Sequence, residues 1–259
     1  MCLGAETKSP HTVYGHYAAS AVETHSFSSE PVLAVNLSSP LDRVAVIIVN
    51  WNSGHWLDAC LDALFKQSRL PSRVLVVDNA SSDTSLANSK GNWHDVEFIR
   101  LKKNFGFAEA NNIAVKMVDD CDWVALLNPD AIPHVDWLEQ LLSAVQEHPE
   151  CVCFGSRQLQ FHDPSKLDGI GDVYHVSGAH WRMGHGRVAN ASDLEVKEIF
   201  SPCAAAALYR TEVLREVGGL DRSFFCFAED VDLAFRLLRI LAQTEHPFWF
   251  KMNTYSGTT

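Results

Sequence analysis

The chain has 259 residues, of which 47% are hydrophobic and 20% are charged, so it is able to bury the core of a globular protein. Its 14 glycines and 10 prolines follow no short repeat, which excludes a collagen-like or fibrous chain. Lys and Arg total 21 against 32 Asp and Glu, a formal net charge of −11. This charge disfavours nucleic acid as a partner but is compatible with a small phosphorylated ligand held through a divalent cation.

The beginning of the chain and the cysteines bear on the cellular compartment. Residues 1–42 are rich in Ser, Thr, His and Pro, and we expect a loosely ordered N-terminal extension there. This segment lacks the continuous apolar stretch of a secretory signal, and the longest aliphatic run, Val44–Val49, is too short to span a bilayer. The seven cysteines form no CxxC pair and predict reduced, mostly buried thiols. We expect a cytoplasmic protein with no transmembrane segment, with the inner face of the membrane as an alternative position.

From Arg43 onward, strand and helix patterns alternate. Continuous apolar runs predict buried strands over residues 44–49, 73–77, 96–101, 123–127 and 151–155. Apolar residues at helical spacing follow them, most clearly over residues 57–65, 110–117 and 136–147. The alternation predicts an α/β domain over residues 43–241, with a mostly parallel central sheet and helices on both faces. Residues 242–259 are expected to form a divergent or truncated tail.

The second half of the predicted domain has a different pattern. Residues 157–190 are short pieces containing Gly and His, which predict loops or hairpins laid over the ligand site. Residues 204–208 resemble a strand of small residues, residues 211–217 a capped helix that ends at two glycines, and residues 230–241 a final amphipathic helix.

Polar residues follow three of the predicted strands. Asn50, Asp78 and the tripeptide Asn128-Pro129-Asp130 each come directly after an aliphatic run. Because ligands of parallel sheets bind at the carboxyl ends of the strands, we expect these side chains at one edge. Asp130 could hold a hard cation that also contacts a diphosphate, and oxygen ligands suit Mg²⁺ or Mn²⁺. The same tripeptide also suits an ordinary β-turn.

Two further groups of side chains could carry chemistry. The carboxylate and amide of Asp78 and Asn79 could hydrogen-bond a nucleobase or a ribose, although both residues are also favoured helix caps. Glu229, Asp230 and Asp232 place three carboxylates within four positions at a predicted helix start. Capping explains one or two of them, and one could act as a general base.

Five segments taken together resemble glycosyltransferase family two, and within it the rhamnosyltransferase-like branch. They are IVNWN (48–52), VVDNASSD (76–83), NFGFAEANN (104–112), LLNPDA (126–131) and FAEDVDL (227–233). The resemblance covers residues 43–240, and five motifs in the right order are more specific than any one of them.

The resemblance implies a GT-A nucleotide-diphospho-sugar transferase fold and an inverting hexosyltransferase of polysaccharide biosynthesis. A sugar, rhamnose by branch resemblance, would move from a dTDP- or UDP-linked donor to a hydroxyl of a glycan or lipid-linked acceptor. By motif position, Asp130 would bind Mg²⁺ or Mn²⁺, Asp230 would be the general base, and Glu229 and Asp232 would position the base or the acceptor. Asp78 would bind the pyrimidine.

The remaining substrate-binding residues also follow from the resemblance. Asn104, Gly106 and Asn112 match the loop that closes over the nucleotide sugar. Asn50, Asn79 and Asn128 complete the set expected at the donor.

Two departures from the family pattern leave an alternative open. The metal motif is Asn128-Pro129-Asp130 in place of the usual DxD, and residues 242–259 replace a strand and a histidine-containing segment, with His246 a poor substitute. The alternative is a catalytically impaired module that binds nucleotide sugars. A dinucleotide-dependent oxidoreductase is disfavoured because no GxGxxG follows the first strand. A nucleotidyltransferase is disfavoured because no basic, glycine-rich phosphate loop lies there.

Overall fold

The computed structural model describes residues 43–87, 93–243 and 250–258. The N-terminal extension expected over residues 1–42, and His246, lie outside them. The strands are β1 (Val44–Asn50), β2 (Arg73–Asp78), β3 (Val96–Arg100), β4 (Trp123–Leu127), β5 (Ile132–Pro133), β6 (Cys153–Gln160), β7 (Leu167–Gly169), β8 (Asp172–Tyr174), β9 (His180–Arg182), β10 (Ala206–Arg210) and β11 (Phe250–Thr258). The helices are α1 (Trp56–Phe65), α3 (Phe107–Val115), α4 (Trp137–Glu147), the 3₁₀ turn η1 (Ala191–Leu194), α5 (Thr211–Glu216) and α6 (Glu229–Gln243).

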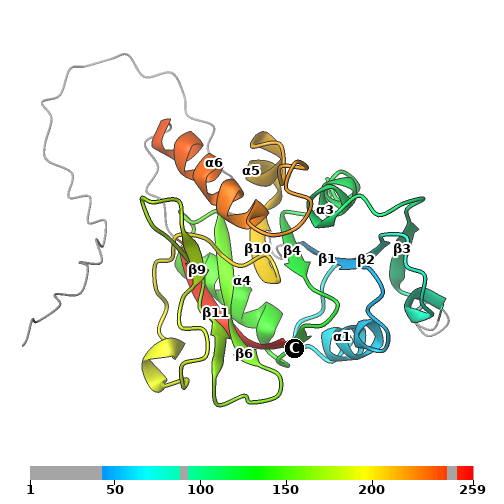
Figure 1. Cartoon of the computed structure of the whole chain (residues 1–259), viewed down its shortest axis with the longest axis horizontal. Coiled ribbons are helices and arrows are strands. Elements are labelled where there is room, and N and C mark those ends of the chain that lie inside the picture. The colour runs from blue at the N-terminus through cyan, green and yellow to red at the C-terminus, as the bar shows by residue number, and fades with distance from the viewer. Residues whose placement is uncertain (1–42, 88–92, 244–249, 259) are drawn as a thin grey trace, which may run out of the picture. The chain divides into compact units, whose positions relative to one another are not determined.

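One large sheet organises the described residues (Figure 1). Its strand order is β3-β2-β1-β4-β10-β6-β11-β5, with β7 beside β6. The strands from β3 to β4 run parallel, β10 is antiparallel to both of its neighbours, and β11 is parallel to β6. The predicted mostly parallel central sheet is therefore confirmed.

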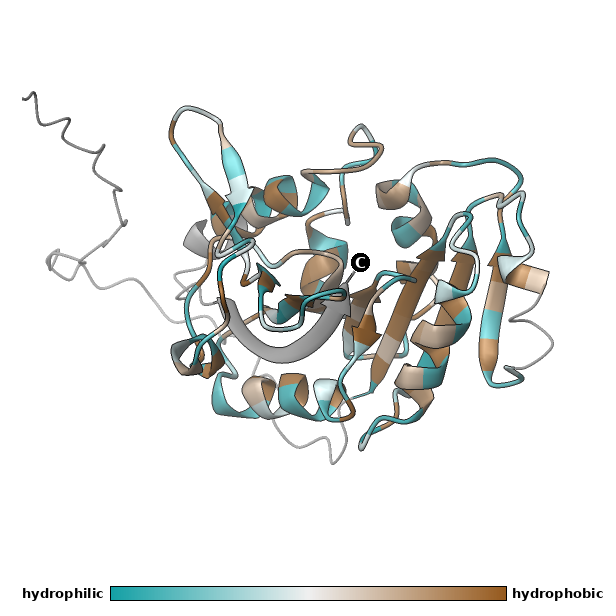
Figure 2. Ribbon diagram, turned by 60° about the horizontal axis from the view of Figure 1, so that its bottom comes forward, coloured by the Kyte–Doolittle hydropathy of each residue, from teal (hydrophilic) through white to brown (hydrophobic). Residues whose placement is uncertain are grey.

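Helices cover both faces of the sheet because successive strand residues point to opposite sides. Val44, Val46 and Ile48 of β1 pack in one cluster with α1 and α4. Ala45 and Ile47, which alternate with them, pack in the other cluster with α3, α5 and α6. Figure 2 shows central strands that are hydrophobic along their length and helices of mixed character. Because both faces of these strands are buried, their sequences are continuous apolar runs.

The predicted elements agree with the observed ones, with shifts at their ends. The strand expected at residues 204–208 is β10 at Ala206–Arg210, and the one expected at residues 151–155 is β6, which continues to Gln160. Residues 250–258 of the expected tail form β11, which joins the sheet beside β6. Six cysteines in the described part of the chain are free, and five of these are buried. No helix there has the length and apolar character needed to cross a bilayer.

The sheet brings the polar ends of its central strands together. Asn50 and Asp78 are the last residues of β1 and β2, and they are partners in the parallel register. β4 runs beside β1 in the same direction and ends at Leu127, directly before Asn128. The carboxyl ends of β1, β2 and β4 therefore lie together at the edge of the sheet where the ligand site is expected.

Candidate functional site

Asn50 organises the polar edge of the sheet rather than facing a ligand. It is fully buried, and its Nδ2 lies 3.0 Å from Oδ1 of Asp78, 3.1 Å from Oγ of Ser81 and 3.0 Å from Oγ of Ser85. Its Oδ1 accepts a hydrogen bond from the Ser53 hydroxyl. Both Nδ2 hydrogens are therefore shared among these three oxygens, and Oδ1 is also hydrogen-bonded. Asn50 therefore positions Asp78.

Asp78 is fully buried but incompletely paired. Its Oδ2 has no hydrogen-bond partner among the described residues, and the nearest cation is Nε of the exposed Arg100 at 3.6 Å. A buried carboxylate oxygen in this state can still accept a hydrogen bond. The cavity described next is lined by the neighbouring Asn79 and not by Asp78.

A cavity of about 720 Å³ lies at this edge, and we call it the Asp130 cavity. Strand ends and the loops that follow them supply one wall, and the segment before α6 supplies another. The lining includes Trp51, Asn79, Asn104, Gly106, Phe107, Asn128, Asp130, Phe225, Cys226 and Phe227. Aromatic surface and a few amide and carboxylate groups are the usual composition of a site for a small organic ligand.

Asn79 fixes the loop that leads into α3. Its Nδ2 donates to Oδ1 of Asn104 at 2.8 Å and to the carbonyl of Gly106 at 3.1 Å, and its Oδ1 accepts from the main-chain N–H of Phe105 at 2.9 Å. Asn104 also accepts from the main-chain N–H of Gly106 at 2.8 Å. The sequence motif over residues 104–106 is thus held rigidly against the end of β2.

Gly106 allows this loop to meet the segment before α6. Its φ is 85°, and a Cβ added there would lie 2.4 Å from the carbonyl oxygen of Phe225. That oxygen accepts a hydrogen bond of 2.7 Å from the main-chain N–H of Phe107. Only glycine fits this close approach without strain.

A second cavity, of about 340 Å³, adjoins the first, and we call it the Asp230 cavity. Its lining includes Asp172, His180, Trp181, Arg182, Cys203, Glu229 and Asp230. Phe107, Asn128, Cys226 and Phe227 line both cavities, so the two adjoin, and we call them together the cleft. Asp130 and Asp230 therefore face the same cleft from different elements.

Asp230 is held at the start of α6 by two main-chain donors. Its Oδ2 accepts from Ala204 N–H at 3.1 Å, and its Oδ1 accepts from Val231 N–H at 2.9 Å. Glu229 beside it is 5% exposed, and its Oε2 has no hydrogen-bond partner among the described residues. Burial, together with the negative charge of Asp230, raises the pKa of Glu229 to about 7.

Asp172, Arg182 and Cys203 are cleft residues that sequence reasoning missed. Asp172 and Arg182 come from the β8–β9 hairpin, within the segment expected only to cover the site. Burial, followed by the charge of Asp230, raises the pKa of Asp172 to about 7, although Arg182 opposes the shift. The motif around Asp172 is Asp-Gly-Ile-Gly-Asp, which offers no ligand or catalytic spacing. Only the fold brings it to Asp230.

Two groups of side chains offer donor atoms for a cation. Asp172, Cys203 and Asp230 have ligand atoms within 4.8 Å of one another, but Nη2 of Arg182 lies 2.7 Å from Cys203 Sγ, and its Nε lies 4.0 Å from Asp172. A guanidinium already supplies positive charge there, and Mg²⁺ and Mn²⁺ prefer oxygen to sulfur. Asp130, in the larger cavity, offers a carboxylate beside open space for diphosphate oxygens, so its donor chemistry fits a hard cation better.

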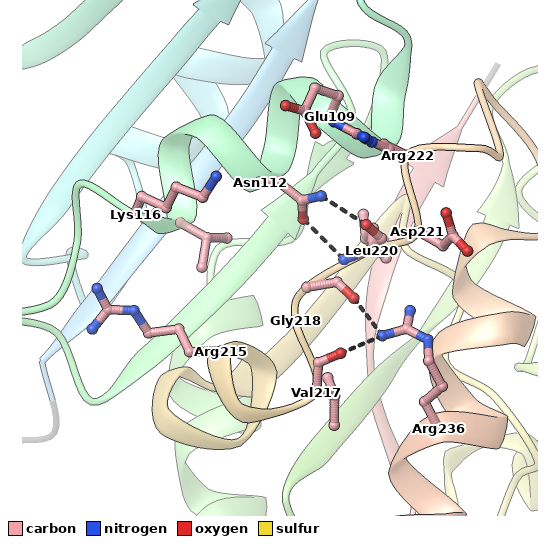
Figure 3. A pocket seen from close by; sticks show the side chains of 12 residues that line it. Glu109, Asn112, Lys116, Arg215, Val217, Gly218, Leu220, Asp221, Arg222 and Arg236 are labelled. Atoms are coloured by element: carbon pink, nitrogen blue, oxygen red, sulfur yellow. Dashed lines mark hydrogen bonds between the residues drawn. The ribbon is translucent and has the colours of Figure 1, made fainter.

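Asn112 and Asp232 are not brought to the cleft. Asn112 binds Leu220 through Nδ2 to the carbonyl at 2.7 Å and through Oδ1 to the N–H at 2.9 Å (Figure 3). Oδ2 of Asp232 pairs with Nε of Arg236 at 2.8 Å. Asn112 and Arg236 line a different cavity, of about 600 Å³, between α3, α5 and α6. Asn112 therefore joins α3 to the segment after α5, whereas Asp232 pairs within α6, and neither residue lines either cavity of the cleft.

The segment before α6 carries unusual backbone conformations. Phe227 and Ala228 have φ of 75° and 65°, in the left-handed region that non-glycine residues seldom adopt. Phe227 is also 83% exposed while lining both cavities of the cleft. Such strain concentrates at functional sites.

Comparison with known sequences and structures identifies the family of this chain. The sequence model of the family described as Glycosyl transferase family 2 matches residues 45–218. N-acetylglucosaminyl-diphospho-decaprenol L-rhamnosyltransferase of Mycobacterium tuberculosis is 26% identical over 226 residues, covering 76% of this chain and 70% of that protein. O-antigen chain rhamnosyltransferase RfbN of Salmonella typhimurium is 25% identical over 201 residues, covering 76% of this chain and 61% of that protein.

Solved structures share the fold at low sequence identity. GalNAc-T7 with UDP, GalNAc and Mn²⁺ superposes with a TM-score of 0.68 and 13% identity, covering 85% of this chain and 44% of that one. TarS 1–349 of S. aureus in complex with UDP superposes with a TM-score of 0.59 and 18% identity, covering 84% and 61%. The predicted GT-A fold is confirmed. The chain spans less than two thirds of these solved structures.

Proposed function

Because the chain belongs to glycosyl transferase family 2, we propose that it moves a sugar from a nucleoside diphosphate to an acceptor hydroxyl with inversion at the anomeric carbon. The observation that carries this proposal is the pair of adjoining cavities, one lined by Asp130 and the other by Asp230. Inversion needs a base on the acceptor side and stabilisation of the leaving diphosphate on the opposite side. The two carboxylates suit these two tasks.

Asp230 is proposed as the general base. It takes the proton of the acceptor hydroxyl while the acceptor oxygen forms a bond to the anomeric carbon. The bond between that carbon and the diphosphate oxygen breaks, and its electron pair leaves with the nucleoside diphosphate. The hydrogen bonds from Ala204 and Val231 fix the carboxylate for this transfer. Glu229, directly beside it, lines the same cavity.

The donor would occupy the Asp130 cavity. Asp130 would hold Mg²⁺ or Mn²⁺, and the cation would supply positive charge for the diphosphate. The loop fixed by Asn79 and Asn104 would close one side of the donor, and Asn128, which lines both cavities, would lie near the reacting carbon. The unpaired Oδ2 of Asp78 supports a hydrogen bond from a pyrimidine N–H, for which the wall above it must open.

The relatives support a narrower proposal for the substrates. Two of them are rhamnosyltransferases, and one acts on an N-acetylglucosaminyl-diphospho-decaprenol. We therefore propose dTDP-rhamnose as the donor and a lipid-linked or glycan hydroxyl as the acceptor. The catalytic domain would occupy residues 43–241, with β11 completing its sheet.

A donor panel with and without Mn²⁺ tests the function. Calorimetric titration with dTDP-rhamnose, dTDP-glucose, UDP-glucose and UDP-N-acetylglucosamine gives affinity, and release of free nucleotide on adding a polyprenyl-diphosphate N-acetylglucosamine gives turnover. We expect Mn²⁺-dependent binding and acceptor-dependent release. Binding without release over a wide acceptor panel would favour the impaired nucleotide-sugar-binding module. No binding of any nucleotide sugar would reject both.

A further inference from the structure

Asp172 lies against the proposed base although the two residues are 58 positions apart in the chain. Asp172 begins β8 and is 6% exposed, and its carboxylate, that of Asp230 and the Cys203 thiol lie within 4.8 Å of one another. Both acids line the Asp230 cavity. Two carboxylates this close, with Asp172 buried, interact strongly because bulk water screens their charges only in part.

We propose that Asp172 is a positioning residue that makes Asp230 a stronger base, so that the two carboxylates act as a pair that shares the proton taken from the acceptor hydroxyl. The inference rests on the proposed function and names a residue that the family motifs do not contain. An ionised Asp172 favours the protonated form of Asp230, since protonation relieves the repulsion between them. When the proton reaches Asp230, the negative charge of Asp172 remains beside it and stabilises the product state.

Arg182 keeps two negative charges tolerable in one buried site. Its Nε lies 4.0 Å from Oδ1 of Asp172, and its Nη2 lies 2.7 Å from Sγ of Cys203. Its Nη1 also donates to Oδ2 of Asp168. The guanidinium is therefore anchored by β7 and the segment before β10 while it faces Asp172. Without such a cation, we expect the pair to keep its proton to a higher pH, because Arg182 opposes the rise in the pKa of Asp172.

The charges around the pair come from every element packed against it. Glu229 and Asp230 face Asp172 from α6, Arg182 from β9 and Asp168 from β7. Cys203 lies beside the pair, and the buried Tyr209 of β10 lies near all of them. Burial raises the pKa of the Cys203 thiol to about 12, so the thiol stays neutral at working pH. Asp172 and Glu229 each have a pKa raised to about 7. The imidazole of His180 on β9 is a further titratable group that lines the same cavity.

The pair predicts a definite pH dependence. Asp172, whose pKa is raised to about 7 chiefly by burial, is protonated below about pH 7 and ionised above it, so we expect the rate to rise through this range. Asp172→Asn keeps the size of the side chain and removes its charge. We expect the acid limb of the kcat/KM profile to move down by at least about one pH unit, with kcat at pH 8 falling about tenfold because the base is weaker.

Two variants are expected to move the acid limb of the kcat/KM profile in opposite directions, which tests the inference directly. Arg182→Gln removes the compensating positive charge and should move the acid limb of the kcat/KM profile to higher pH. Asp172→Glu keeps the negative charge and should leave the acid limb near its wild-type pH. Asp163→Asn is the matched control, since Asp163 is exposed and pairs with Lys166 at 3.0 Å outside the cleft. Donor affinity should be the same in all four variants. A purely structural role for Asp172 would change stability and rate without moving the limb.

A titration of the Asp172 carboxyl by ¹³C NMR tests the coupling without turnover. We expect this carboxyl to titrate near pH 7 in the wild type and at lower pH in Asp230→Asn, because the charge of Asp230 contributes to the raised pKa of Asp172. An Asp172 titration that is unchanged in Asp230→Asn, or an acid limb that moves in Glu229→Gln but not in Asp172→Asn, would overturn the inference. If the wild type transferred no sugar, the proposed function would fail, while the carboxyl titration would still show whether the two acids are coupled.

Discussion

The main-chain N–H of Ala204 donates a hydrogen bond of 3.1 Å to Oδ2 of Asp230, which ties the first turn of α6 to the segment that precedes β10. This bond holds the carboxylate on the wall of the Asp230 cavity. Asp230 is thus presented by a fixed framework, as a general base must be if it is to meet a hydroxyl in one geometry.

Asp230→Asn should lower kcat by at least ~10²-fold, because the amide cannot accept the acceptor proton. The amide has nearly the size of the carboxylate, so donor affinity should stay at the wild-type value. Steady-state kinetics and nucleotide titration measure the two effects. Asp232→Asn is the comparison, since the Asp232 carboxylate pairs with Arg236 away from both cavities. Unchanged turnover in Asp230→Asn would remove this residue from the mechanism.

Asp130→Ala should abolish the part of nucleotide binding that depends on Mn²⁺. Asp130 is the carboxylate of the Asn-Pro-Asp motif and lines the larger cavity, so its removal leaves a cation without its acidic protein ligand there. Titrations of the nucleoside diphosphate with Mn²⁺ and with a chelator give the metal-dependent part of the affinity. Asp95→Ala, at an exposed position away from the cleft, serves as the control. Equal metal dependence in the two variants would rule out Asp130 as the ligand.

Glu229→Gln should change how stability depends on pH. The pKa of Glu229 is raised to about 7 in the folded chain and is about 4.3 in the unfolded chain. Between these values the unfolded chain loses a proton that the folded chain keeps, so the wild type loses stability as pH rises toward 7. The variant lacks this loss. Urea unfolding should show its free energy of unfolding rising relative to wild type by about 2 kcal/mol between pH 5 and pH 8. A constant difference between the two proteins would contradict the prediction.

Gly106→Ala should destabilise the protein and weaken donor binding. An added Cβ would lie 2.4 Å from the Phe225 carbonyl oxygen at a φ of 85°, so the loop or the segment before α6 must move. We expect a loss of about 1–3 kcal/mol in the free energy of unfolding. Gly178→Ala is the matched control, because Gly178 has a φ of 88° but open space around the added atom. Equal losses in both variants would mean that the contact with Phe225 is unimportant.

Asn112→Ala separates the structural position of this residue from the role expected for it. The variant loses two hydrogen bonds to Leu220 and should lose about 1–3 kcal/mol in the free energy of unfolding. Nucleotide affinity should not change, because Asn112 lies outside the Asp130 cavity. Asn79→Ala, which loosens the loop over residues 104–106, should reduce both quantities. A loss of nucleotide affinity in Asn112→Ala without a loss of stability would show that Asn112 takes part in donor binding.

The order of strands and helices was predictable because local patterns encode it. Val44–Val49 is apolar throughout since both faces of β1 are covered, and the polar Asn50 marks where that strand ends. The carboxylates after the strands were also visible, since parallel strands must deliver them to one edge. Motif spacing alone could not separate Asp230, which lines the cleft, from Asp232, which turns toward Arg236.

Local patterns were enough to predict the α/β alternation, the polar strand ends and the acidic start of the last helix, because each depends on residues close together in the chain. The contacts between distant side chains became visible only in the folded arrangement. Asp172 reaches Asp230 because a hairpin folds back over the cleft, and Asn112 turns to Leu220 because α3 packs beside the segment after α5. Contacts between residues so distant in sequence are set by the packing of whole elements, which no local spacing records.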